Sequence, residues 1–193
     1  MAITITTEMV KALRTRTGAG IMDCRRALEQ AGGDLEAAAA ILKTRGLAAA
    51  ATRAGRTASE GLVEAYVHPG NRLGALVEVN CETDFVARTD EFRTLARELA
   101  MQVAAAAPRV VAKDDIPAEE LAARRAAIAR DEPGADDATI ERRLGQWIAE
   151  VALLEQPYIR DAGRRVGEMI TDAIARTGEN IQVRRFARFK LGE

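Results

Sequence analysis

Residues 77–92 read Val-Glu-Val-Asn-Cys-Glu-Thr-Asp-Phe-Val-Ala-Arg-Thr-Asp-Glu-Phe, and they mark a change from strand to helix. The apolar, β-branched residues before Asn80 and Cys81 are typical of a strand. An acid, Asp84, and a large aromatic, Phe85, follow where the chain turns back into helix. Loops that carry function are often held at the rim of a rigid scaffold. Phe85 therefore either packs against its own helix or is presented to another protein.

The segments on either side of this stretch predict a small antiparallel sheet. Leu62–Val67 and Leu73–Cys81 alternate around a turn at 69–71, which is the pattern of a β-hairpin. The segment Ile181–Leu191 also alternates and predicts a third strand. One predicted face of that strand carries Ile181, Val183, Ala187, Phe189 and Leu191, and the other carries Gln182, Arg184, Phe186, Arg188 and Lys190.

Helical patterns fill most of the chain around the predicted strands. They cover residues 89–106, 117–130, 138–154 and 163–177, with Thr89 as a cap and a proline at the start of the second. The sequence therefore predicts an α+β fold, a small antiparallel three-stranded sheet packed with helices.

A sheet covered by helices on one side leaves its other face open. We expect Phe186 and Tyr66 on this open face, among charged residues. The face is then either an ordinary wetted surface or a contact between the sheets of two copies. The residues alone favour the wetted surface.

The start of the chain predicts a separate three-helix unit. Thr6 or Thr7 caps the first helix, and glycine-rich breaks at 17–20 and 32–33 separate it from the second and third. Gly46 is expected to close the third helix in the left-handed conformation. The chain then divides into a three-helix domain at 1–46, a connector at 47–60 and an α+β core at 61–193.

The charge of the chain is balanced overall but uneven along its length. The formal net charge is −1, while residues 1–56 carry +4, residues 57–162 carry −8 and residues 163–193 carry +3. The molecule as a whole is therefore not an electrostatic binder of nucleic acid. The basic N-terminal section is expected to have a partner surface of its own.

The residue types that most enzymes need are scarce. His68 is the only histidine, in a Pro-Gly turn, and Ser59 is the only serine, in the predicted connector. Cys24 and Cys81 form no CxxC pair and suit a reducing compartment. The sequence therefore predicts no enzyme, no bound metal and no cofactor. Without a signal-peptide pattern or a run of about 20 apolar residues, a cytoplasmic protein that does not enter a membrane is expected.

The turn after Cys81 has two interpretations. Thr83 or Asp84 fits the N-cap of a helix, and Phe85 then packs within its own subunit. Alternatively, Phe85 is displayed for a partner. Because capping accounts for the residue types, the pattern alone favours the packed aromatic.

Several segments, in order, resemble the elongation factor Ts family of bacteria. The segments Val10–Arg14 and Thr17–Cys24 are similar to its opening signature, and Glu78–Ala87 is similar to its central signature. Further matches occur at 156–158 and at 184–192. Longer members carry two related halves, whereas this chain shows one hairpin and one terminal strand. It thus resembles the short form, which implies a homodimer formed through the open sheet face.

The resemblance implies guanine nucleotide exchange on elongation factor Tu, the GTPase that delivers aminoacyl-tRNA. Phe85 is then expected to enter an apolar slot between helices of the GTPase. Thr83, Asp84 and Val86 are expected to help disturb its Mg²⁺ site. The resemblance thereby reverses the preference between the two interpretations of the turn.

The first domain resembles a ubiquitin-associated-like domain that grips the same GTPase. Arg14, Ile21 and Met22 match positions expected to touch the partner, although Ile21 and Met22 also fit a core and Arg14 a solvated charge. A nucleic-acid-associated translation factor that uses the basic segment 184–190 is an alternative, as is a carboxylate-based hydrolase. The former needs aromatics for stacking, and residues 1–56 contain none. Neither alternative explains the Thr-Asp-Phe-Val turn, so no direct contact with nucleic acid is expected.

Overall fold

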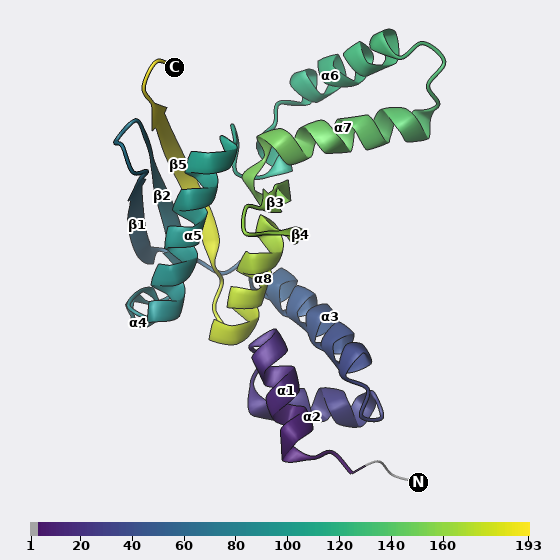
Figure 1. Ribbon diagram of the computed structural model, residues 1–193, viewed down its shortest axis with the longest axis vertical. Coiled ribbons are helices and arrows are strands. Elements are labelled where there is room, and N and C mark those ends of the chain that lie inside the picture. The colour runs from purple at the N-terminus through teal and green to yellow at the C-terminus, as the bar shows by residue number, and fades with distance from the viewer. Residues whose placement is uncertain (1–3) are drawn as a thin grey trace.

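The computed structural model describes residues 4–193 as a three-helix bundle, a sheet with its covering helices, and a helical hairpin (Figure 1). The bundle lies at one end of the molecule, and the hairpin of α6 (Ala118–Asp131) and α7 (Asp137–Val151) at the other. The sheet and α5 (Asp90–Ala106) lie on one side between them. The first three residues of the predicted 1–46 domain lie outside the described residues. The α+β class is confirmed.

The other elements complete this order. The remaining helices are α1 Thr7–Thr17, α2 Ile21–Gln30, α3 Leu35–Arg53, α4 Asp84–Ala87 and α8 Val166–Thr177, with 3₁₀ turns η1 Lys113–Asp115 and η2 Leu153–Glu155. The strands are β1 Glu60–Val67, β2 Leu73–Cys81, β3 Pro157–Tyr158, β4 Asp161–Arg165 and β5 Gln182–Lys190. Within residues 4–193, no helix is both long and apolar enough to cross a membrane.

The N-terminal bundle consists of α1, α2 and the first half of α3, and its helix ends follow from the sequence. The Thr6 hydroxyl accepts a hydrogen bond from the Met9 N–H and so caps α1. Gly18, at φ 69°, ends α1 in a left-handed conformation that a side chain would strain. Asp34 caps α3 by accepting two backbone N–H groups. The buried side chains are Leu13, Cys24, Ala27, Leu28 and Ala38.

The third helix is longer than the sequence predicts. It does not end at Gly46 but continues to Arg53, so half of the predicted connector at 47–60 is helical. Alanine fills much of this segment, and alanine is the best helix former. A Cβ atom on Gly46 would lie 3.5 Å from the Ala175 Cβ, which is an ordinary contact, so α3 passes close to α8 at this residue. A single helix therefore joins the bundle to the core.

The sheet is three-stranded and antiparallel throughout, as predicted, and its strand order is β1-β2-β5. The hairpin turn is closed by the Asn71 N–H, which donates to the His68 carbonyl over 3.0 Å, and Gly70 has φ 94°. On the inner face of the sheet, α5 and α8 complete the main core. Its largest fully buried side chains include Phe92, Leu99, Val77, Val79 and Val166.

A bulge in β5 corrects the predicted faces of that strand. Glu78 pairs with Arg185, whereas its neighbour Val79 pairs with Val183, so Arg184 has no partner in β2. An extra residue reverses the alternation beyond it. Phe186 accordingly packs against the core, and Tyr66 of β1 lies on the same side. Both were predicted on the open face, and both predictions are wrong.

The open face of the sheet is apolar in consequence. Phe189 is 70% exposed, and its neighbours in the sheet are small or aliphatic rather than charged. The exposed large residues on these strands and just after them are Val63, Val67, Leu76, Phe189 and Leu191. They define the open-face patch. Its composition differs from the wetted surface that the residues alone favoured.

One helix start also differs from the prediction. The last helix begins at Val166 rather than at Gly163, because residues 161–165 pair with Pro157 and Tyr158 as a short ribbon. The ribbon and the bridge between Val110 and Ala152 connect α7 to the core. These pairings are short: the alternating residues around Val110 and Val111 are too few to predict a strand.

Candidate partner-binding site

Phe85 is presented outward at the turn that joins β2 to α5. We define residues 82–87 as the Phe85 turn. The Phe85 side chain is 77% exposed, the largest exposed fraction among the large hydrophobic residues described. Thr83 nevertheless caps α4, because its hydroxyl accepts the Val86 N–H over 3.3 Å. Capping and display therefore occur together, and the expectation that a capped turn buries its aromatic is wrong.

Val86 has the opposite orientation to Phe85. It is 6% exposed and belongs to the main core, together with Ala87. Of the four residues predicted to act on a partner, Val86 therefore anchors the turn from below. A helix of only four residues is not stable by itself, so this anchor matters for holding α4 in place.

Asp84 lies beside Phe85 on the outer surface. Its carboxylate accepts a hydrogen bond from the Arg88 guanidinium over 2.6 Å, and the Asp84 side chain is 59% exposed. An exposed pair of this kind contributes about 0–1 kcal/mol. A partner can therefore draw the carboxylate away from Arg88 at small cost.

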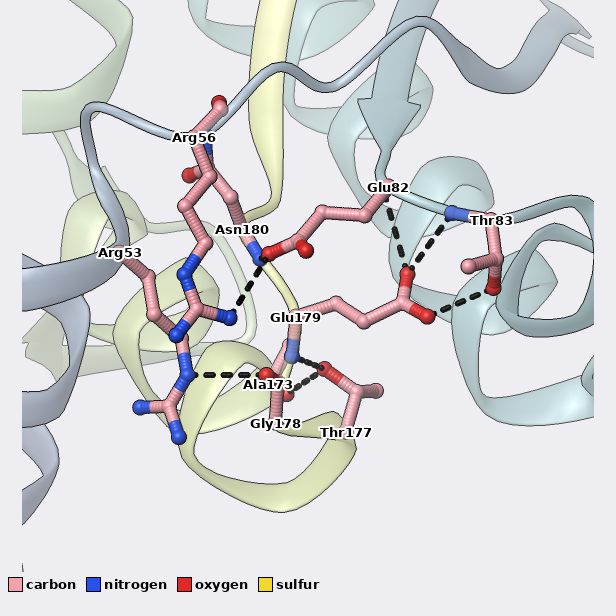
Figure 2. A network of polar contacts seen from close by, with 9 residues as sticks. All are labelled: Arg53, Arg56, Glu82, Thr83, Ala173, Thr177, Gly178, Glu179 and Asn180. Carbon is pink, nitrogen blue, oxygen red and sulfur yellow. Dashed lines mark hydrogen bonds and ion pairs between the residues drawn. The ribbon is translucent and has the colours of Figure 1, made fainter.

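The turn is held in place by groups that the sequence analysis did not identify (Figure 2). Glu179, in the loop between α8 and β5, accepts hydrogen bonds from the backbone N–H groups of Glu82 and Thr83, each over 3.1 Å. Its other oxygen accepts the Thr83 hydroxyl over 2.6 Å. Nothing in the local pattern of residues 178–180 marks this role, because its partners are almost a hundred residues away in the chain.

Cys81 supports the turn from the core side. Its thiol is fully buried and donates to the Thr83 carbonyl over 3.2 Å. Burial, assisted by the negative charge of Glu179, raises the pKa of the Cys81 thiol to about 11. The thiol therefore keeps its proton at neutral pH and remains a hydrogen-bond donor. Cys81 is therefore a buried structural residue that packs like a small hydrophobic side chain.

The predicted N-terminal contact residues gather at one end of the bundle. Arg14 lies in the last turn of α1, and Ile21 and Met22 lie in the first turn of α2, joined by the short loop at 18–20. Ile21 is 54% exposed and Met22 is 61% exposed, so neither is a core residue. Two adjacent exposed apolar side chains are unusual unless they meet a partner.

One arginine of the core lies between the two surfaces. Arg176 in α8 forms an ion pair with Glu91, in the first turn of α5 just after the Phe85 turn. The same side chain contacts Gly18, where an added Cβ would lie 2.9 Å from the Arg176 Cδ. The loop that precedes Ile21 thus packs against the core close to the Phe85 turn.

The described residues offer no metal centre. In residues 4–193, no three His, Cys, Asp or Glu side chains form a group that could hold a metal ion. The arrangement that does exist is an exposed aromatic with an adjacent carboxylate, and a second exposed apolar pair on the N-terminal bundle. Exposed aromatic and apolar side chains beside a polar rim are typical of surfaces that bind another protein.

Comparison with known proteins identifies the family. The family model described as elongation factor TS matches residues 49–193. Elongation factor Ts of Carboxydothermus hydrogenoformans is 53% identical over 195 aligned residues, covering 98% of this chain and 90% of that protein. The proteins of the same name from Heliobacterium modesticaldum and Caldanaerobacter subterraneus are 51% and 53% identical, covering 98% of this chain and 91% and 98% of theirs. The chain therefore belongs to the elongation factor Ts family of translation elongation factors.

Proposed function

We propose that this chain is a guanine nucleotide exchange factor that binds elongation factor Tu and promotes release of its GDP. The observation that carries the proposal is the display of Phe85 on an anchored turn with Asp84 beside it. Membership of the family supports the identity of the partner. The chain performs no covalent chemistry in this function, and it acts in the cytoplasm, where translation takes place.

Exchange of this kind follows from linkage between two binding equilibria. GDP is held by backbone N–H groups of the phosphate loop and by Mg²⁺ that bridges phosphate to protein. A protein that binds the nucleotide-free GTPase more tightly than the GDP form must lower the affinity for GDP by the same factor. Phe85 enters an apolar slot between helices of the GTPase, while Asp84 leaves Arg88 and rearranges polar groups near the Mg²⁺ site.

Burial of the Phe85 ring sets how large a loss of GDP affinity the chain can impose on the GTPase. Transfer of a phenylalanine side chain from water into an apolar slot gains about 1.5–3 kcal/mol. Because Phe85 is mostly exposed in the free protein, nearly all of this gain is released on binding. It can offset a loss of GDP affinity of about tenfold to a hundredfold.

The N-terminal bundle contributes affinity in this proposal. Arg14, Ile21 and Met22 contact the nucleotide-binding domain of the GTPase. The exposed groups that distinguish this end of the bundle are apolar, which favours a protein partner over the phosphates of a nucleic acid. The alternative of a nucleic-acid-associated factor therefore gains no support from the site.

The test is the release of labelled GDP from elongation factor Tu with and without the chain. We expect release to accelerate as the chain is added and to reach a plateau when all GTPase is bound. Titration with salt distinguishes the nucleic-acid alternative, since binding to nucleic acid weakens steeply as salt rises. An unchanged rate of GDP release at saturating chain contradicts the proposed function.

We also propose that two copies pair through the open-face patch. Phe189 and Leu76 lie on adjacent strands, and a face of this composition is unstable in water unless it is covered. The Arg109–Glu120 ion pair lies away from the sheet and provides a polar control. We expect Leu76→Arg to convert a dimer into a monomer in analytical ultracentrifugation, while Glu120→Gln on α6 leaves the dimer intact. A monomeric native chain at micromolar concentration would exclude this pairing.

A further inference from the structure

We propose that Glu179 is a positioning residue that holds the Phe85 turn in the form that engages the GTPase. The inference rests on the proposed exchange function and deepens it. Glu179 is far from the displayed ring in sequence and acts through Thr83 and the backbone rather than by touching the partner. It belongs to a network that also includes the end of α3 (Figure 2).

The carboxylate of Glu179 fixes both the backbone and the cap of the turn. One oxygen accepts the N–H groups of two successive residues, Glu82 and Thr83, at 3.1 Å each. The other oxygen accepts the Thr83 hydroxyl proton at 2.6 Å. Since that proton is directed to Glu179, the hydroxyl oxygen presents its lone pairs to the Val86 N–H at the start of α4. Hydrogen bonds to a charged acceptor are about twice as strong as neutral ones.

The two loops hold each other reciprocally. While Glu179 accepts N–H groups of the Phe85 turn, the carboxylate of Glu82 in that turn accepts the Asn180 N–H at 2.6 Å. The Glu179 N–H is itself 3.3 Å from the Thr177 hydroxyl oxygen at the end of α8. We call Glu82, Glu179 and Asn180 the crossed-loop network. Hydrogen bonds in both directions between the two loops thus tie the Phe85 turn to the end of α8.

The network also reaches the helix that carries the N-terminal bundle. The Arg53 Nε donates to the Gly178 carbonyl at 2.8 Å, and Asn180 Nδ2 donates to the Arg56 carbonyl at 2.8 Å. The Arg56 guanidinium lies 3.5 Å from the Glu82 carboxylate. Loop 178–180 therefore contacts the end of α3 on one side and the Phe85 turn on the other, as Figure 2 shows.

This arrangement has a consequence for exchange. Once the N-terminal bundle has formed the initial complex, the rate at which Phe85 is inserted scales with the fraction of turns that are in the competent form. Glu179 keeps that fraction high, and the contacts to α3 keep the turn in a fixed position relative to the bundle that bears Ile21 and Met22. Loss of the carboxylate then weakens the step in which Phe85 is driven into the GTPase, more than it weakens the initial complex.

The experiment measures the rate of GDP release from elongation factor Tu over a range of concentrations of the chain. For Glu179→Ala we expect the plateau rate to fall on the order of tenfold, with the half-saturating concentration changed less than about twofold. A partly unfolded preparation behaves differently, because inactive molecules raise the apparent half-saturating concentration and leave the plateau unchanged. A shift of that second kind alone overturns the proposal.

Two matched variants test the chemistry of the contact. Glu179→Gln keeps an oxygen that can accept the Glu82 and Thr83 N–H groups and is expected to retain a higher plateau than Glu179→Leu, which has a similar volume but no acceptor. Glu155→Ala removes a carboxylate that pairs with Arg165, away from the turn, and is expected to change nothing. Equal plateaus for the glutamine and leucine variants contradict the role of Glu179.

A double-mutant cycle with Phe85→Ala separates this inference from the proposed function. If Glu179 acts through the ring, Glu179→Ala lowers the plateau strongly in the native chain and by less than about twofold in the Phe85→Ala background. Equal losses in both backgrounds overturn the positioning role and leave the function standing. A native rate for Phe85→Ala refutes the assigned role of the turn, and with it the proposal for Glu179.

Discussion

The Phe85 turn and the Ile21–Met22 pair both expose apolar side chains, yet their scaffolds differ. Phe85 stands above the largest core of the molecule, on a turn that Glu179 holds through three hydrogen bonds. Ile21 and Met22 begin a helix whose cap, Gly20, supplies no side-chain hydrogen bond, in a bundle with a small core. Similar surfaces are thus carried on a stiff support and on a more adaptable one.

The difference suggests a division of work between the two surfaces. A group that is to deform its partner must itself yield less than the partner does, which requires a scaffold fixed by buried contacts. A group that contributes affinity needs only to bury its surface and tolerates adjustment on binding. Phe85 suits the first task and the N-terminal pair suits the second. The continuous helix α3 connects the supports of both surfaces.

The largest expected effect comes from removing the ring itself. Phe85→Ala eliminates the burial energy of about 1.5–3 kcal/mol, so the plateau rate of GDP release should fall about tenfold to a hundredfold. Because the ring is mostly exposed in the free protein, the melting temperature should stay within a degree or two of the native value. Stopped-flow fluorescence of labelled GDP measures the rate. Phe85→Leu retains an apolar side chain and should lose less.

The same measurement shows whether Phe85 deforms the GTPase or only contributes affinity. A fall in the plateau with an unchanged half-saturating concentration assigns Phe85 to the deforming step. A rise in the half-saturating concentration alone would make the turn a second affinity surface, and the proposed division of work would then be wrong.

Changes to the N-terminal pair are expected to act on affinity alone. Replacing Ile21 and Met22 together by serine should raise the half-saturating concentration about tenfold, because two partly exposed side chains lose their burial on binding. The plateau should remain native. Leu47→Ser is a matched control, since Leu47 is 50% exposed on α3 but lies outside the predicted contact set. A lower plateau for the double variant would show that the bundle also takes part in deforming the GTPase.

The stiffness of the turn can be probed through Cys81 and pH. Its pKa is about 9.0 in an unfolded chain and about 11 when the protein is folded, chiefly because of burial. The folded state therefore binds the proton more tightly, and the stability gained from this is complete below pH 9 and is lost as the pH rises to 11. We expect the native chain to lose on the order of 1 kcal/mol more over this range than Cys81→Ala.

The test compares how steeply the free energy of unfolding falls with pH in the two proteins, and not its absolute value. Cys81→Ala leaves a small cavity and lowers stability at every pH, so urea unfolding must be followed from pH 8 to pH 11 in both proteins. Burial raises the pKa of Tyr158 to about 12, so its ionisation also lowers the free energy of unfolding at alkaline pH. This contribution is the same in both proteins. Parallel stability curves would mean that the Cys81 thiol is not protected beneath the turn.

Local patterns in the sequence predicted much of this architecture. The hairpin and the cap at Thr89 depend on residues close together in the chain, and both are confirmed. Thr83 and Phe85 were recognised as the informative residues of the turn, although capping alone favoured burial of the ring. The exposure of that ring depends on the depth of the neighbouring core, which no local pattern specifies.

The features that were missed depend on contacts between distant segments. The bulge at Arg184 reverses the faces of β5, and alternation cannot reveal it because each half of the strand alternates normally. Glu179 is one acid among many, and its role exists only where β2 and α8 end side by side. The predicted end of α3 at Gly46 was wrong because residues 47–53 continue the helix, which packs against α8.

The smallest expected effect distinguishes a helix that ends at Gly46 from a helix that continues through it. If the glycine ended a helix in the left-handed conformation, Gly46→Ala would strain the backbone and destabilise the protein by about 1 kcal/mol. In the continuous helix the new methyl group meets the Ala175 Cβ at 3.5 Å, an ordinary contact, and alanine is the better helix former. We therefore expect urea unfolding to show stabilisation by about 0.5–1 kcal/mol. Gly46→Leu, whose larger side chain does not fit against α8, should destabilise the protein instead. A destabilised Gly46→Ala variant would contradict a continuous helix through this residue.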